Sequence, residues 1–479
     1  MEDLKQRTAR GLMWGAVNNG ATQVLNLVFG IVLARLLSTS DYGIMALLTI
    51  FTTLAGCIQA AGFSQALANL KPPTRNDYNA VCWFNMLAGF SIYVILFLCA
   101  PLIARFFHQP ELLNASRLAF LTIPISSLGI VPNAKLWIEL RNRELAISAI
   151  TSLMISGCVG IWLAFHGYAY WSLAWQQIVF ISSNVVIKYY FTRWKPSLPV
   201  DFSPIRRMFG FASNMLLTNM LTTVSQNVLT FIFGKLLPIS SVGQFNQANK
   251  WNGMGSMLIT NTMTQVAQPV FTNVSDDTER QVRVFRKMLR FASFVSFPLM
   301  LGLALIAHEF IIITIGEKWA PSVPLLQLLC VGGAFMPLHN VYQNFLASRG
   351  RSDLFLRFVA IQIVLQIVIT LALAPYGIKT MVAAYAALNV VYTLCWHFAF
   401  TRVQRIAFRE VFMDVVPFAF IALVVMVVVY FCTYTFESLW VRLVLRVVIA
   451  AVLYIGIMKL LRVKTFDDCV AFMKSRLKG

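Results

Sequence analysis

Acidic residues are scarce in this chain, and those present avoid the middle of its apolar segments. The sequence has 19 aspartates and glutamates against 39 lysines and arginines, for a formal net charge of +20. Its eight cysteines show no metal-ligand spacing and its five histidines are scattered, so we predict neither a metal site nor disulfides. No motif for a cofactor is present, and no cofactor is predicted.

Long apolar segments dominate the sequence, of which 58% is hydrophobic. A helix needs roughly 20 apolar residues to cross the hydrocarbon core of a bilayer. The pattern predicts an all-α, polytopic membrane protein with about 14 transmembrane helices. We place these spans near residues 11–34, 42–68, 79–104, 113–134, 146–166, 169–187, 208–234, 242–271, 291–314, 321–347, 358–374, 378–400, 412–434 and 438–458.

The basic residues fall almost entirely on alternate gaps between these spans. With the N-terminus inside, 30 of the 39 lysines and arginines lie on the inner side and eight on the outer side, while Lys250 lies within a span. Short cytoplasmic loops carry an excess of lysine and arginine, so both termini are predicted to be cytoplasmic. Because this charge is spread over eight inner segments, it indicates contact with anionic membrane lipids and no nucleic-acid partner.

The chain also matches itself at an offset of 200 residues. Residues 35–43 align with 235–243, with a cation, two leucines, a serine and a glycine at corresponding places. Six predicted spans separate the two copies, and because six is even, the halves should share one orientation. We therefore predict two six-helix lobes related by a pseudo-two-fold axis along the membrane normal, as in many alternating-access transporters. The predicted parts are an N-lobe (1–201), a C-lobe (202–405), and two extra helices with a cytoplasmic amphipathic tail (406–479).

Polar side chains form a stripe on one face of the first predicted helix and again on the seventh. The stripes have i, i+4 and i+7 spacing and consist of Asn19, Gln23 and Asn26, and of Asn219, Thr223 and Gln226. Amides facing lipid would be costly, so both stripes should face protein or water. Two interpretations stay open: hydrogen bonds that join neighbouring helices, and two walls of a shared polar cleft, which the repetition of the stripe favours.

The eighth predicted helix is more polar still, and Lys250 lies within it beside Asn246 and Asn249. A central lysine costs about 2.5 to 3.5 kcal/mol on insertion scales, so an intramembrane cation suggests a functional role. Lys250 lies ten residues past Ser240, or about 15 Å at helical rise. Substrate binding, snorkelling to the interface and a structural ion pair are the three interpretations, although no obvious intramembrane acid is available for the last.

The polar residues also indicate a class of substrate. A site for a cation or a proton relay normally needs buried carboxylates, and the first and seventh predicted spans contain none. Amides hydrogen-bond to hydroxyl groups, and an ammonium group pairs with phosphate. A cleft lined by asparagine, glutamine and lysine therefore suits an anionic, hydroxyl-rich substrate better than a cation.

Several short stretches, taken in order, resemble a known family. They are Leu33 to Gly43 with its Asp-Tyr-Gly, Gly243 to Ala248, Gln268 to Phe271, the Gly-Glu-Lys-Trp-Ala-Pro of Gly316 to Pro321, and Gly350 to Asp353. The chain resembles the polysaccharide flippases (Wzx-type, colanic-acid-exporter-like) of the multidrug, oligosaccharidyl-lipid and polysaccharide exporter superfamily. The family often has proline where this chain has Thr39.

The resemblance implies a V-shaped bundle that moves an undecaprenyl-diphosphate-linked oligosaccharide across a bacterial cytoplasmic membrane, with lipids and other polysaccharide-assembly proteins as partners. On this hypothesis Lys250 and the neighbouring amides hold the diphosphate and the first sugars. A cation-coupled multidrug antiporter of the same superfamily is the alternative. An enzyme acting on lipid-linked sugar is not expected, because such enzymes generally need reactive carboxylates or histidines on a sizeable outer loop, and the outer gaps here are short.

Overall fold

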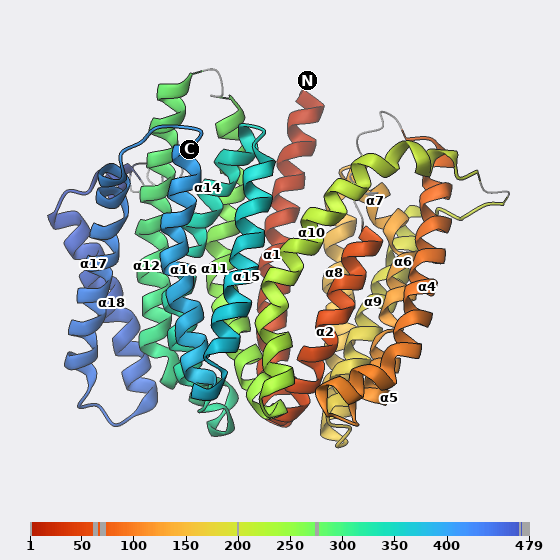
Figure 1. Cartoon of the computed structure of the whole chain (residues 1–479), viewed down its shortest axis with the longest axis horizontal. Coiled ribbons are helices and arrows are strands. Elements are labelled where there is room, and N and C mark those ends of the chain that lie inside the picture. The colour runs from red at the N-terminus through yellow and green to blue at the C-terminus, as the bar shows by residue number, and fades with distance from the viewer. Residues whose placement is uncertain are drawn as a thin grey trace. The chain divides into compact units, whose positions relative to one another are not determined.

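A computed structural model describes residues 2–60, 66–67, 73–198, 201–273, 277–468 and 471, and within these ranges the chain forms helices and no strands (Figure 1). The predicted all-α fold class is confirmed. Most of the predicted amphipathic tail, residues 465–479, lies outside the described residues.

The chain divides into two compact units, Met1–Gly243 and Gln244–Gly479. The first unit contains α1 (Glu2–Leu36), α2 (Thr39–Ala60), α4 (Arg75–Phe107), α5 (Leu112–Ala119), α6 (Thr122–Leu128), α7 (Ile130–Ile138), α8 (Asn142–Phe165), α9 (Tyr170–Thr192) and α10 (Ser203–Leu236). The helix α11 (Ile239–Asn273) begins in the first unit and continues into the second. The second unit then contains α12 (Thr278–Ile315), η1 (Glu317–Trp319), α13 (Ser322–Gly333), α14 (Met336–Ser348), α15 (Ser352–Ala372), η2 (Ala374–Tyr376), α16 (Ile378–Thr401), α17 (Phe408–Thr433) and α18 (Leu439–Leu460).

Apolar length identifies most of the predicted spans. Within the described ranges, ten helices are long and apolar enough to cross a membrane, or 11 if the bent pair Leu112–Leu128 and Ile130–Ile138 is one span. The helices α9, α10 and α11 coincide with predicted spans but are not among those ten. In α10 and α11 the amides and Lys250 lower the apolar content. The chain is thus a multi-pass membrane protein, and the count of 14 spans stays a prediction.

The helix α10 belongs with the first unit, whereas the sequence-based division placed it at the start of the second lobe. It packs against α2 and α4. Near its N-terminus, Arg207 Nη2 lies 3.3 Å from Asp77 Oδ1 in the first turns of α4. Contacts of this kind cannot be read from a repeat in the sequence, and the predicted three-part division stays a prediction.

The two copies of the 200-residue repeat contact each other through equivalent residues. Gly43 lies in the second turn of α2, and Gly243 lies in the second turn of α11. A Cβ atom on Gly43 would collide with the carbonyl oxygen of Ile239, and one on Gly243 would collide with the carbonyl oxygen of Thr39. Positions 39 and 43 thus meet positions 239 and 243 reciprocally, as expected for two segments related by a local two-fold axis.

Three of the stretches that carry the family resemblance have structural roles here. Asp41 caps α2, because its carboxylate accepts from the backbone N–H of Ser38 at 2.8 Å and from the Ser38 hydroxyl at 2.7 Å. In the Gly-Glu-Lys-Trp stretch, Gly316 adopts a positive φ of 96° that ends α12, and the Trp319 side chain is fully buried. In the stretch 350–353, Arg351 Nε lies 2.9 Å from Asp353 Oδ1 in the first turn of α15.

Candidate functional site

Lys250 lies with two amides on the less buried face of α11. Asn246, Asn249 and Lys250 are half-buried and lie at i, i+3 and i+4, on one side of the helix. The opposite side is packed, because Ala248 is fully buried and Asn252 is 4% exposed. The three residues that the sequence grouped at this helix therefore share a face that the second unit leaves partly open.

Packing on the buried side sets the rotation of α11 and thus the direction of Lys250. The indole of Trp251 packs edge-on against the ring of Phe310 in α12, with ring centroids 4.9 Å apart. Gly333 of α13 leaves room for the Asn252 side chain, which a Cβ at that position would strike. Within the described ranges, no carboxylate pairs with the Lys250 ammonium group, so the interpretation as a structural ion pair has no partner there.

The two polar stripes differ in their surroundings within the first unit. On α1, Asn19 and Asn26 are exposed and Gln23 is half-buried, and none of the three bonds to a neighbouring helix in the described part of the chain. On α10, Gln226 is exposed and Asn219 is half-buried.

Thr223, the middle residue of the α10 stripe, lies in an interhelical contact. Its hydroxyl oxygen is 2.9 Å from the Cys57 sulfur of α2. Thr223 therefore joins two helices, as the first interpretation of the stripes expects, and the cleft interpretation stays a prediction.

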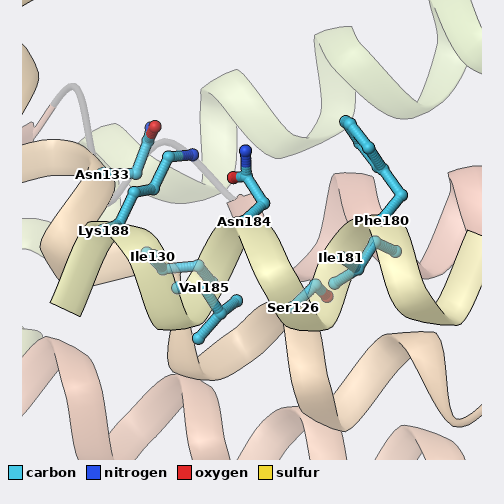
Figure 2. Close-up of a pocket in the computed structure, with 9 residues that line it drawn as sticks. Ser126, Ile130, Asn133, Phe180, Ile181, Asn184, Val185 and Lys188 are labelled. Carbon is cyan, nitrogen blue, oxygen red and sulfur yellow. The ribbon is translucent and has the colours of Figure 1, made fainter. Parts of the chain in front are cut away.

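A pocket in the first unit brings together a second lysine and two further amides. It has a volume of about 310 Å³, within the range of about 300–1,000 Å³ typical of ligand sites, and lies between the α6–α7 junction and α9. Figure 2 shows Asn133 of α7 pointing to the same side as Asn184 and Lys188 of α9. Phe180 also lines this space, one turn before Asn184.

A bend between two helices and a buried glutamine shape this pocket. The bent pair of helices breaks at Gly129 with an angle of 43°, and Gly129 lines the pocket. A Cβ there would come within 2.8 Å of the Val185 side chain, so glycine allows the break to lie close to α9. On the α6 side, Gln59 of α2 fixes the wall: its side chain accepts from the Ser126 hydroxyl at 2.8 Å and donates to the Ile123 carbonyl at 2.7 Å.

Sequence analysis missed the Lys188 pocket. Its predicted span ended at residue 187, so Lys188 counted as a cation of the inner loop, whereas α9 continues to Thr192. The available signal was the i, i+4 spacing of Asn184 and Lys188 on a helix that also carries Phe180 at i−4. Asn133 is 51 residues before Asn184, and only the fold brings the two together.

The buried carboxylates of the described chain are all engaged by partners. Asp41 caps α2, and Asp77 accepts from the Thr74 hydroxyl at 2.7 Å. Glu309 of α12 is 1% exposed, and its Oε2 lies 2.7 Å from Arg446 Nη1 of α18. Asp414 is the fourth of these acids and lies on α17.

Asp414 and Glu410 bind arginines in the N-terminal part of α12. Asp414 Oδ2 lies 2.6 Å from Arg286 Nε, and Glu410 Oε2 lies 2.7 Å from Arg286 Nη1. Arg290 adds a contact to Asp414 at 3.5 Å. Figure 1 shows α17 and α18, in blue, beside α12. These ion pairs therefore fasten the two extra helices to α12 and leave the carboxylates committed to arginines.

No group of three histidine, cysteine or acidic side chains able to hold a metal ion occurs among the residues that were placed. Two histidines have internal partners instead. His339 Nε2 lies 2.9 Å from the Thr393 hydroxyl, and His397 Nδ1 lies 3.3 Å from the Tyr342 hydroxyl.

These features define a class: an all-helical, multi-pass membrane protein of the transporter type, with an internal repeat and half-buried cations. Residues 32–324 match the family model described as polysaccharide biosynthesis protein, which covers more than half of the chain. The chain belongs to this family.

Curated relatives resemble the chain in sequence, and a solved structure resembles it in fold. The chain is 25% identical over 368 residues to the lipopolysaccharide biosynthesis protein WzxC of Escherichia coli K12, covering 74% of this chain and 73% of WzxC. It is 24% identical over 357 residues to the teichuronic acid biosynthesis protein TuaB of Bacillus subtilis, covering 74% of each. Its fold is similar to the lipid II flippase MurJ in an inward closed conformation, with a TM-score of 0.77, 12% identity, and coverage of 94% of this chain and 99% of MurJ.

Proposed function

We propose that this protein is a flippase that moves a lipid-diphosphate-linked oligosaccharide of the undecaprenyl type from the inner to the outer leaflet of a bacterial cytoplasmic membrane. The transport serves the synthesis of a surface polysaccharide. The family match, the biosynthetic relatives and the fold shared with a lipid II flippase all support this substrate class. On this proposal the protein translocates its substrate without making or breaking covalent bonds in it.

The observation that carries the proposal is the arrangement of charge within the apolar bundle. Lys188 and Lys250 are half-buried lysines beside amides and have no acidic partner in the described ranges. The buried carboxylates, in contrast, are occupied by arginines or by helix caps. A buried charge without a partner is costly, so these lysines favour a ligand that brings negative charge.

In the proposed mechanism, Lys250 holds the diphosphate, and Asn246 and Asn249 bond to the adjoining oxygens. The amides of the two stripes then contact the sugars, which need donors and acceptors together. These amides are Asn19, Gln23 and Asn26 on α1, and Asn219 and Gln226 on α10. The lobes rock between inward-open and outward-open states, while the lipid tail stays in the bilayer. Both termini lie in the cytoplasm, as the distribution of basic residues indicates.

Deletion of the gene tests this proposal directly. A complete lipid-linked glycan should accumulate on the cytoplasmic face, and the surface polysaccharide should disappear. Complementation with Lys250→Ala should restore membrane insertion but little export, whereas Lys379→Ala, an exposed lysine in the same unit, should restore both. Accumulation of an incomplete glycan would instead indicate an enzyme that extends it. Full export by Lys250→Ala would remove Lys250 from the site.

The cation-coupled antiporter remains the alternative. Such a transporter needs a buried carboxylate that is free to bind a cation. Glu309 and Asp414 are buried but form ion pairs with arginines, which disfavours this role. Export of a cationic dye driven by a Na⁺ or H⁺ gradient would restore the alternative.

A further inference from the structure

We propose that the Lys188 pocket binds one sugar unit that carries an anionic group, either a carboxylate or a phosphate. This inference rests on the proposed function, because it names a part of the glycan that the protein recognises. All the residues that line the pocket belong to the first unit, whereas Lys250 belongs to the second.

The charge in the pocket requires a negative partner. Lys188 is half-buried, and no described carboxylate lies within ion-pair distance of its ammonium group. Leaving a cation unpaired in a partly dry environment is unfavourable, and an anionic ligand relieves that cost. Arg286 on α12 and Arg446 on α18 show the opposite arrangement, because each has its acid in place.

The neighbouring groups favour a sugar over a simple anion. Asn133 and Asn184 line the same space and form no side-chain hydrogen bonds within the described chain. Each amide offers a donor and an acceptor, as adjacent hydroxyl groups on a sugar require. Phe180 adds an apolar surface against which the C–H face of a sugar ring can lie. The volume of about 310 Å³ is at the lower end of ligand pockets, which suits one ring and its charged substituent.

The direction of Lys188 disfavours a phospholipid headgroup as the ligand. The most exposed apolar side chains of this part of α9 are Val186, 67% exposed, and Tyr190, 73% exposed, and they mark the side suited to lipid. Residues two positions apart on a helix with 3.6 residues per turn lie about 200° apart. Lys188 is two positions from both, so it points away from that side, as does Asn184, which is two positions from Val186.

Ligand binding to the full-length protein in detergent tests the inference, with saturation-transfer NMR to detect weak binding. The probes are glucuronate and glucose 1-phosphate as anionic sugars, glucose as the neutral match, and glycerol 3-phosphate as the headgroup fragment. Wild type should bind at least one anionic sugar more tightly than glucose or glycerol 3-phosphate. Lys188→Gln should weaken that binding about tenfold or more, as expected for the loss of one charge-assisted hydrogen bond.

Two further variants make the result specific. Asn133→Asp keeps Lys188 but supplies an acid across the pocket, so it should also weaken binding of the anionic sugar. Lys195→Gln removes an exposed lysine seven residues further on and should bind like wild type. Equal binding by wild type and Lys188→Gln, no binding of either anionic sugar by wild type, or preference for glycerol 3-phosphate would each overturn the inference.

An export assay separates failure of this inference from failure of the proposed function. If Lys188→Gln exports the glycan as well as wild type, the pocket inference fails while the flippase proposal stands. If wild type binds anionic sugars through Lys188 but deletion of the gene leaves glycan export intact, the flippase proposal fails.

Discussion

The ion pair between α12 and α18 gives the sharpest prediction about stability. Glu309 is 1% exposed and Arg446 is 5% exposed, and their nearest side-chain atoms are 2.7 Å apart. Replacing Glu309 with leucine removes the acid but leaves the arginine buried. Only neutral partners then remain for Arg446: the Leu305 carbonyl, 3.0 Å from its Nη1, and the Thr433 hydroxyl, 3.1 Å from its Nε. Breaking a buried pair in this way costs about 3–5 kcal/mol, so Glu309→Leu should lower the free energy of unfolding by that amount.

The measurement is the free energy of unfolding of purified protein in mixed micelles, titrated with a denaturing detergent and followed by circular dichroism. Asp353→Asn is the matched control, because the Arg351–Asp353 pair is exposed and solvent screens its attraction, so its loss should leave the free energy of unfolding nearly unchanged. The double variant Glu309→Leu/Arg446→Leu should be more stable than Glu309→Leu alone, because Arg446 is no longer left buried without its acid. Arg442, which lies 3.3 Å from Glu309 Oε1, loses the acid in both variants. If Glu309→Leu lowers the free energy of unfolding no more than Asp353→Asn does, the reasoning about the Glu309–Arg446 pair is wrong.

Two more predictions follow from the packing. Gly243→Ala places a methyl group against the carbonyl oxygen of Thr39, so it should reduce both the yield of folded protein and glycan export. Gly253→Ala, on the same helix, has open space around it and should change neither. Similar yields for the two variants would contradict the close contact. Asp414→Asn weakens the attachment of α17 to Arg286, so hydrogen–deuterium exchange measured by mass spectrometry should be faster in residues 408–418. Unchanged exchange would show that the ion pair does not hold the N-terminal end of α17.

The sequence predicted the parts of the fold that depend on local composition. Apolar length located the spans, because the bilayer imposes a minimum length on any helix that crosses it. The repeat marked positions 43 and 243, and the structure shows the reason for glycine at both: the two backbones contact there. The sequence grouped Asn246, Asn249 and Lys250 on one polar helix, and the structure shows that all three lie half-buried on one side of α11.

Long-range pairing was beyond sequence reasoning. Arg446 was counted as an outer-side cation, yet it lies buried against Glu309, 137 residues away. The Lys188 pocket was missed for a related reason: the end of a helix is uncertain by several residues, and an error there moved Lys188 from the helix to the loop. No local pattern reports which helix packs against α9, so Asn133 had no visible connection to Lys188.

Translocation of lipid-linked sugar by the purified protein tests the central claim most directly. The protein is reconstituted into vesicles that carry a fluorescent lipid-diphosphate-linked oligosaccharide, and a membrane-impermeant reagent reports how much of it reaches the opposite leaflet over time. We predict protein-dependent translocation that is much slower with Lys250→Ala and unchanged with Lys379→Ala. Vesicles in which wild type moves no more lipid-linked sugar than protein-free vesicles would contradict the account.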